Sequence, residues 1–270
     1  TLQYRIRFLM GYPEIVIDIS SMSKLLIMNL LIGLSTLNKR LTIAYTEAKT
    51  YLPTRAQYQR KKGNSRLGAS KLYFQTLEHS ATVTSTNLSS IAMSDAPRFL
   101  VGFPTFNEDL LITLFQEFSP NACLIVHGVP LRVKDEWRLK AIKYINSHIL
   151  NQISENDQIK ISTYWYADTF ALLERYYQQV KLTHKFIIGP PSSKLQAVAV
   201  SLFKIYRGDV QILYPTPKSY SLQEHSEQSS RVHSIEFSPF SDFMKKLVQR
   251  RHEIDVAGLE RPQVLRQFNP

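Results

Sequence analysis

Short runs of apolar residues alternate with longer segments of helical period along most of this chain. The short runs are rich in β-branched and aliphatic residues, as is typical of parallel strands covered on both faces. We predict strands at residues 15–19, 41–45, 98–103, 121–126, 158–163, 186–188 and 210–214. Helices are predicted at residues 25–37, 110–118, 135–150, 168–180, 193–206 and 244–251. This alternation predicts an α/β fold with mostly parallel sheets.

Two stretches about 170 residues apart share one order of elements. Each reads as a strand, a Ser- and Lys-containing turn, an apolar helix, a second strand and the pattern Tyr-x-x-x-Lys-Ser/Thr-Tyr. The turns are Ser21-Met22-Ser23-Lys24-Leu25 and Pro191-Ser192-Ser193-Lys194-Leu195, and the tyrosine segments are residues 45–51 and 214–220. The fold expected is therefore a tandem of Rossmann-like units related by a pseudo-two-fold internal repeat.

Changes in composition divide the chain into four parts. A first α/β unit is expected at residues 1–53 and a second at 97–220. Between them, residues 54–96 are first basic and then rich in Ser and Thr, which favours a linker. Residues 221–270 are expected to form a polar loop followed by a basic helix and tail.

The charge of the chain bears on its partners. Thirty-three Lys and Arg residues against twenty-two Asp and Glu residues give a net charge of +11. A field of this sign favours anions, so we expect a nucleotide or oligonucleotide ligand, with nucleic acid or an acidic protein as a further partner. The oligomeric state stays open.

Other classes of protein are disfavoured. One cysteine, Cys123, excludes an internal disulfide and a multi-cysteine zinc site, and the seven histidines show no ligand spacing. We therefore expect no metal and no cofactor. The longest apolar stretch, residues 25–37, is shorter than the roughly 20 residues of a membrane-spanning helix. A cytoplasmic protein without a membrane partner is expected.

The two Ser-Lys turns are the best candidates for a ligand site. A strand that ends in hydroxyl residues and a Lys, just before a helix, supplies free N–H groups, a helix dipole and a cation in a small volume. This combination suits a phosphate, although helix capping by serine alone explains part of it. The expected ligand-binding residues of the turns are Ser21, Ser23, Lys24, Ser192, Ser193 and Lys194.

The tyrosine segments supply a second set of candidates at the same predicted edge. Tyr45 and Tyr214 could stack a base, while Lys49 and Lys218 could neutralise a phosphate. The alternative is that the tyrosines close the edge of a sheet and that each lysine is solvated. The pattern alone leaves both interpretations open.

The turns resemble the ligand-contacting turn of CRISPR-associated Rossmann-fold (CARF) sensors. Its usual form is Thr-Gly-Gly-Thr-Lys-x-Met, and residues 191–195 and 21–25 match it in the hydroxyl, the Lys and the apolar residue that follows. Such sensors bind cyclic or linear oligonucleotides across a two-fold axis, and two fused copies resemble the related SAVED sensors. The resemblance implies a single pocket lined by Ser23, Lys24, Ser193 and Lys194, sensing rather than turnover, and a role in prokaryotic defence or stress signalling.

Two other functions remain as alternatives. Asp18 and Glu47 have no counterpart in the second copy, and as strand-end acids they could serve a nucleotide-processing hydrolase or glycosidase. A basic adaptor is the other alternative, since a cluster of cations could grip a phosphate backbone or an acidic protein. That cluster consists of Arg55, Arg60, Lys61, Lys62 and Arg66.

Overall fold

The computed structural model describes residues 9, 11–64, 79–83, 88–217 and 226–249. Two sheets and the helices between them share one large apolar core. The α/β class and the parallel sheet expected from the sequence are confirmed. Within the described ranges, no helix combines the length and the apolar character that crossing a membrane requires.

The larger sheet has five strands in the order β6-β5-β4-β7-β8, and all of its pairings are parallel. The strands are β4 (Arg98–Gly102), β5 (Ala122–Val129), β6 (Gln158–Ser162), β7 (Lys185–Ile188) and β8 (Gln211–Ile212). This is the strand order of a doubly wound Rossmann-like sheet, in which the direction of winding changes between β4 and β7.

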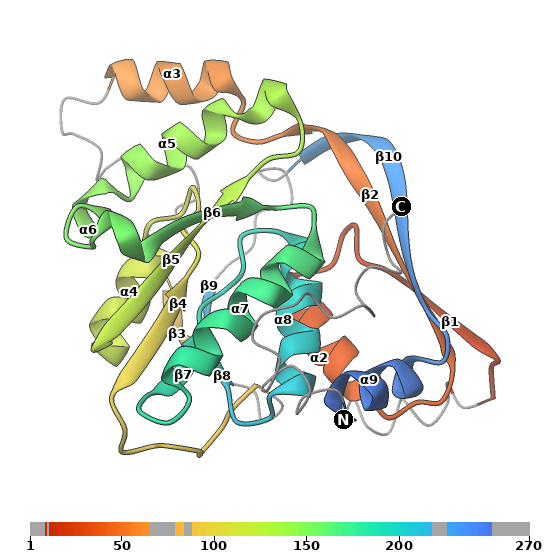
Figure 1. Ribbon diagram of the computed structural model, residues 1–270. Helices are drawn as coiled ribbons and strands as arrows, with labels where there is room; N and C mark the ends of the chain where they lie inside the picture. Colours follow the sequence, from red (N-terminus) through yellow and green to blue (C-terminus); the bar gives the residue numbers. More distant parts are fainter. Residues whose placement is uncertain (1–8, 10, 65–78, 84–87, 218–225, 250–270) are drawn as a thin grey trace.

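Helices cover both faces of this sheet (Figure 1). They are α4 (Asp109–Phe118), α5 (Trp137–Ile145), α6 (Ser147–Leu150), α7 (Tyr166–Val180) and α8 (Lys194–Tyr206), with short 3-10 turns η2 (Val133–Asp135) and η3 (Glu155–Asp157). Because side chains alternate along a strand, Leu100 packs with Leu114 of α4, whereas Val101 lies in the core with α7 and α8. Helix α8 is buried along almost its whole length, as its apolar sequence favours.

The smaller sheet has the order β1-β2-β10. Strand β1 (Glu14–Asp18) runs parallel to β2 (Arg40–Tyr51) through the crossover helix α2 (Lys24–Leu34), while β10 (Ser226–Phe237) is antiparallel to β2. Helix α2 packs against α8, and α9 (Phe240–Gln249) lies beside them (Figure 1). The helices α2 and α8 that follow the two Ser-Lys turns are therefore neighbours between the two sheets.

Three local expectations were wrong. Residues 55–64 form the helix α3 (Arg55–Asn64) instead of a linker loop, and residues 226–231 belong to β10 instead of a polar loop. Both are exposed elements with few buried side chains, so hydrophobic pattern gave little signal. The segment 45–51 lies inside β2 and not after a strand.

The internal repeat stays a prediction. The small sheet combines β1 and β2 of the first unit with β10 from residues 226–237, whereas the second unit carries a parallel sheet of five strands. In place of a long strand like β2, the second unit continues into the short strands β8 and β9 (Tyr214–Pro217), and β9 pairs with β3 (His79–Val83).

Candidate functional site

Lys24 and Lys194 are the first residues of the adjoining helices α2 and α8. Ser23 caps α2 by accepting a hydrogen bond from the N–H of Leu26 at 3.2 Å. Ser193 caps α8 in the same way at 3.1 Å, and the side chain of Gln196 accepts from the N–H of Ser193 in return. Serine caps of this kind fix where a helix begins, so each lysine is held at a helix N-terminus.

The two lysines meet at one place. The ammonium group of Lys194 donates a hydrogen bond of 2.6 Å to the carbonyl oxygen of Met22. Burial, and secondarily the positive charge of Lys194, lowers the pKa of Lys24 to about 8. Burial also lowers the pKa of Lys194, and the carboxylate of Asp18 partly offsets that effect. Two half-buried cations thus lie close enough to disfavour each other's charge.

Asp18 has a structural role at the end of β1. Its carboxylate accepts hydrogen bonds from the N–H of Ser20, at 2.9 Å, and from the Ser20 hydroxyl. These bonds lower the pKa of Asp18, with the charge of Lys194 acting in the same direction. The Ser20 hydroxyl in turn accepts a hydrogen bond of 2.8 Å from the N–H of Thr46. Asp18 is therefore an ionised residue of a turn that ties β1 to β2.

Glu47 belongs to a second polar group, on the buried side of β2. It is 8% exposed, and its Oε2 lies 3.7 Å from Nε2 of His233 on β10. The other ring nitrogen of His233 lies 2.8 Å from the hydroxyl of Tyr164, which follows β6. The ring of Tyr45 stacks on His233 with centroids 6.3 Å apart. Through His233, the small sheet contacts the carboxyl end of the large one.

Trp165 adds an aromatic surface beside these groups. It precedes α7, is 37% exposed, and meets the ring of Tyr164 edge-on with centroids 4.9 Å apart. The hydroxyl of Ser193 donates a hydrogen bond of 2.6 Å to the carbonyl of Thr163, the residue before Tyr164. The lysine turns and the aromatic residues therefore adjoin. We call Lys24, Lys194, Ser193, Tyr164, Trp165, His233 and Glu47 the strand-end junction.

The point where the winding of the sheet changes is filled. A Cβ atom on Gly102, at the end of β4, would lie 2.8 Å from Cδ1 of Leu111. A Cβ atom on Gly189, after β7, would lie 2.7 Å from Cδ1 of Leu114. Leucines of α4 thus pack directly on the sheet beside the ends of β4 and β7. The charged groups lie instead where β6 and α8 face the small sheet.

The structure separates the residues expected at the site. Ser192 and Ser193 lie in the turn before α8, where the Ser192 hydroxyl is bonded to the side chain of Gln196, and Ser21 is exposed in the turn before α2. Tyr214 is 8% exposed and packs in the main core, so it offers no open face for stacking. Lys218 and Arg66 lie outside the described residues.

The first tyrosine segment is held within the protein. The hydroxyls of Tyr45 and Tyr51 are 2.8 Å apart, and burial raises the pKa of Tyr45. The guanidinium of Arg132 lies over the ring of Tyr51 and donates to the carbonyls of Ala48, at 2.9 Å, and Lys49, at 3.2 Å. Lys49 contributes its backbone to this contact, while its side chain is exposed. Of the two interpretations of the pattern, tyrosines that close the sheet have the stronger support.

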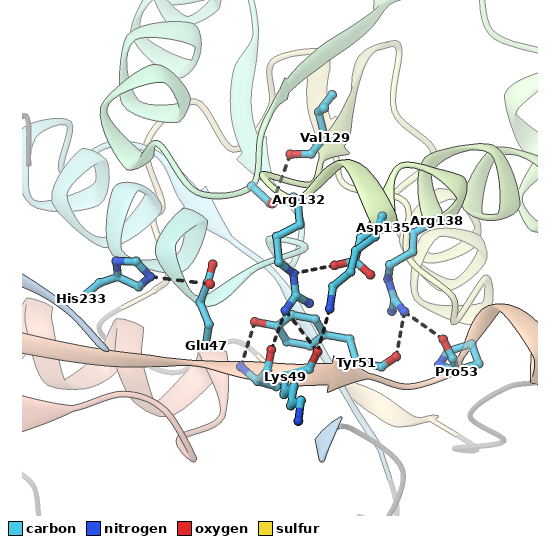
Figure 2. A network of polar contacts seen from close by, with 12 residues as sticks. Glu47, Lys49, Tyr51, Pro53, Val129, Arg132, Asp135, Arg138 and His233 are labelled. Carbon is cyan, nitrogen blue, oxygen red and sulfur yellow. Dashed lines mark hydrogen bonds and ion pairs between the residues drawn. The ribbon is translucent and has the colours of Figure 1, made fainter. Parts of the chain in front are cut away.

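Arginines before and within α5 fasten this part of β2 to the large sheet (Figure 2). Arg132 is itself held by Asp135, with Nε 2.7 Å from Oδ2. Arg138 donates to the carbonyls of Tyr51, Leu52 and Pro53 at 2.9–3.1 Å. The carbonyl oxygens at the end of β2 and just after it thereby accept hydrogen bonds from a charged group. These bonds fix the direction in which the chain enters α3.

Metal and thiol chemistry receive no support. Within the described ranges, no group of three His, Cys, Asp or Glu side chains is arranged to hold a metal ion. Burial raises the pKa of Cys123 to about 11, so this thiol stays protonated at neutral pH. The cations of the strand-end junction remain the main chemical feature of this region.

Sequence reasoning missed Tyr164, Trp165 and His233. Tyr164 and Trp165 directly follow the predicted strand at residues 158–163, which was a usable signal for a strand-end site. His233 carried no such signal, because β10 reaches the site only through its pairing with β2. Comparisons of the chain with protein-family models, curated protein sequences and solved structures give no match.

Proposed function

We propose that the strand-end junction binds the phosphate of a nucleotide or short oligonucleotide and that the protein senses this ligand. The observation that carries the proposal is the meeting of Lys24 and Lys194 at the N-termini of two packed helices. Two cations that disfavour each other gain most from an anion placed between them, and each helix adds its dipole and free N–H groups. The Ser23 hydroxyl, whose oxygen accepts from the N–H of Leu26, adds a further donor.

A nucleotide is favoured over a simple anion by what lies beside the lysines. The half-exposed Trp165 lies two residues after Thr163, whose carbonyl accepts a hydrogen bond from Ser193 in the turn that carries Lys194. An aromatic face can stack any base, with about 1–3 kcal/mol per base. Cations for phosphate and an aromatic face for a base therefore stand next to each other, as the recognition of a nucleotide requires.

Sensing is favoured over turnover by the state of Asp18. Its lowered pKa and its bonds to Ser20 make it a poor proton donor at neutral pH. By the resemblance to CARF and SAVED sensors, such a module would act in prokaryotic defence or stress signalling. The proposal includes a location in the cytoplasm.

A nucleotide-processing hydrolase or glycosidase is the second candidate. It is favoured by the contact between Glu47 and His233, since a carboxylate that orients an imidazole is a common device for a general base. This candidate predicts product formation that Glu47→Gln abolishes while binding persists. Sensing predicts that neither the natural protein nor the Glu47→Gln variant forms a product.

The test of binding is a thermal-shift and calorimetric screen with orthophosphate, pyrophosphate, mononucleotides and cyclic oligonucleotides. A ligand that binds the folded state raises the melting temperature. Lys24→Met and Lys194→Met should each weaken binding at least tenfold, whereas Lys246→Met, at an exposed position of α9, should leave it unchanged. Equal affinity in all three variants would refute the proposal.

A further inference from the structure

Helix α3 is a strongly basic helix fixed to the large unit. Its first turn is capped by Thr54 and Gln57, since the Thr54 hydroxyl accepts from the N–H of Gln57 at 3.2 Å and the Gln57 side chain accepts from the N–H of Thr54 at 2.7 Å. Tyr58 is 6% exposed and packs with Phe106 and Trp137. Tyr58 thus anchors the helix, while residues 55–57 and 59–62 are exposed to solvent.

The exposed positions carry cations and no acid. Arg55, Arg60, Lys61 and Lys62 are all exposed, and the ten residues of α3 include neither Asp nor Glu. Arg55 and Lys62 are seven residues apart, or about 10 Å along a helix. One strand of B-form DNA presents about three phosphates over that length.

Helix α5 extends this charge. It lies beside α3 (Figure 1), and the ammonium of Lys62 is 4.2 Å from the centre of the Tyr144 ring. Lys140 is exposed and Lys143 half-buried on α5, which also lacks Asp and Glu. The exposed sides of these two adjoining helices carry Arg55, Arg60, Lys61, Lys62, Lys140 and Lys143, and we call this set of cations the basic face.

We propose that this basic face binds the phosphate backbone of nucleic acid without reading its sequence. Cations carried by two adjoining helices that contain no Asp or Glu match a polyanion with regularly spaced charges. An acidic protein is a weaker match, because protein interfaces usually contain an apolar centre. Among the described side chains of α3 and α5, only Tyr144 is both large and apolar and exposed.

The basic face is also held rigidly to the strand-end junction. Arg138 of α5 binds the three carbonyls that link β2 to α3, and β2 carries Glu47. The two regions are therefore separate surfaces of one framework. Binding of a polyanion to α3 does not depend on the function proposed for the lysine pair.

The experiment measures binding of a fluorescein-labelled 20-base-pair DNA duplex of arbitrary sequence by anisotropy between 50 and 300 mM NaCl, values chosen to span a steep salt response. The α3 variant carries Arg55→Gln, Arg60→Gln, Lys61→Gln and Lys62→Gln, in which glutamine keeps the helix propensity. A matched control neutralises four exposed cations elsewhere, by Lys160→Gln, Arg175→Gln, Lys245→Gln and Lys246→Gln.

We expect the α3 variant to bind DNA at least tenfold more weakly and to lower the salt slope by about three, since each phosphate contact contributes about 0.9. The control should lose less than threefold, although its net charge is the same. Equal losses in the two variants would show that only net charge matters and would overturn the proposal. So would an α3 variant that keeps its DNA affinity but loses binding to poly-glutamate.

Folding of the variants is checked by circular dichroism and melting temperature. A second variant, Lys140→Gln with Lys143→Gln, removes charge from α5 and leaves α3 intact. It should weaken DNA binding about three- to tenfold. Unchanged binding in this folded variant would exclude α5 from the basic face and contradict the proposal as stated.

Discussion

The ammonium group of Lys194 donates a hydrogen bond of 2.6 Å to the carbonyl of Met22, a residue 172 positions earlier in the chain. This bond joins the turn before α8 to the turn before α2, so the two Ser-Lys turns of the sequence form one local structure. Because Lys24 follows Met22 by two residues, the same contact brings the second ammonium group close. The positive charges of Lys24 and Lys194 repel each other unless solvent, the carboxylate of Asp18 or a bound anion offsets the repulsion.

We expect phosphate binding to weaken as the pH rises through about 8. The pKa of Lys24 is lowered to about 8 by burial and by Lys194, so Lys24 loses its charge above that pH. A bound anion raises this pKa again, and binding near pH 8 should take up protons. Calorimetry in buffers of different ionisation enthalpy measures this uptake. In Lys24→Met the step near pH 8 should vanish, and a step that persists there would assign it to another group.

The same variant should stabilise the protein without ligand. The pKa of Lys24 is 10.5 in the unfolded chain and about 8 in the folded protein, so the unfolded chain keeps this proton to a higher pH. Stability therefore rises with pH across this window, and below pH 8 the charge is unfavourable to folding. Lys24→Met should raise the free energy of unfolding at pH 7 by about 1–2 kcal/mol. Urea denaturation measures it, and a loss of stability would show that Lys24 is a structural residue.

Trp165→Ala should distinguish the contribution of the base to binding from the contribution of the phosphate. Loss of stacking should weaken nucleotide binding about tenfold, which corresponds to about 1.4 kcal/mol, and leave pyrophosphate binding unchanged. Trp165→Phe keeps an aromatic face and should restore most of the affinity. Titration calorimetry gives both affinities. Equal affinity for the nucleotide in all three proteins would place the base elsewhere, while the lysine pair could still bind phosphate.

Glu108 should make stability fall between about pH 4.5 and 7. Its side chain is nearly buried, with Oε2 3.5 Å from Nδ1 of His148, and burial, assisted by the charge of Asp109, raises its pKa to about 7. Because the folded pKa exceeds the unfolded one, the carboxyl group favours folding below pH 4.5 and this contribution is lost as the pH rises through 7.

Glu108→Gln keeps the shape of the side chain and removes its titration. It should be more stable than the natural sequence at pH 8 by about 2–3 kcal/mol and about equal at pH 4.5. Urea denaturation at the two pH values provides the comparison. A difference that is the same at both would attribute the effect to packing.

Arg138→Lys should destabilise the junction between β2 and α3. The guanidinium reaches three successive carbonyls and also lies 4.6 Å from the centre of the Phe106 ring. A lysine ammonium group cannot present several donors in one plane to the three carbonyls. We therefore expect a loss of about 1–3 kcal/mol in the free energy of unfolding. Lys140→Ala, at an exposed position of the same helix, should change stability by less than about 0.5 kcal/mol. Similar losses of stability in both variants would show that Arg138 does not hold the segment between β2 and α3.

The sequence alone indicated the strands and helices of the large sheet. The runs at residues 98–103, 121–126 and 186–188 are buried on both faces, and such strands give a strong local signal. Helix α8 was also expected, because a long apolar run follows the Ser-Lys turn at residues 191–195, and the structure adds a capping box of Ser193 and Gln196. The Ser-Lys turns were found in the same way, since both residues lie at fixed offsets from a helix start.

Weaker elements gave no such signal. Among residues 55–62 of helix α3, whose burial is described, Tyr58 alone is buried, and a single buried residue produces no helical period. Strand β10 is exposed over most of its length, so its alternation is not visible in the sequence. Its pairing with β2 depends on a partner some 180 residues away, and no local pattern encodes such a distance.

The sequence by itself determined the α/β class, the two Ser-Lys turns and the excess of positive charge, because these depend on local propensity, spacing and composition. Tertiary structure decided that the turns of Lys24 and Lys194 lie side by side, that His233 contacts Tyr164 after β6, and that α3 packs beside α5. Packing of α2 on α8 brings the two lysine turns together, Tyr58 of α3 packs against Trp137 of α5, and such packing of one helix on another depends on the whole core. No single segment of the chain carries that information.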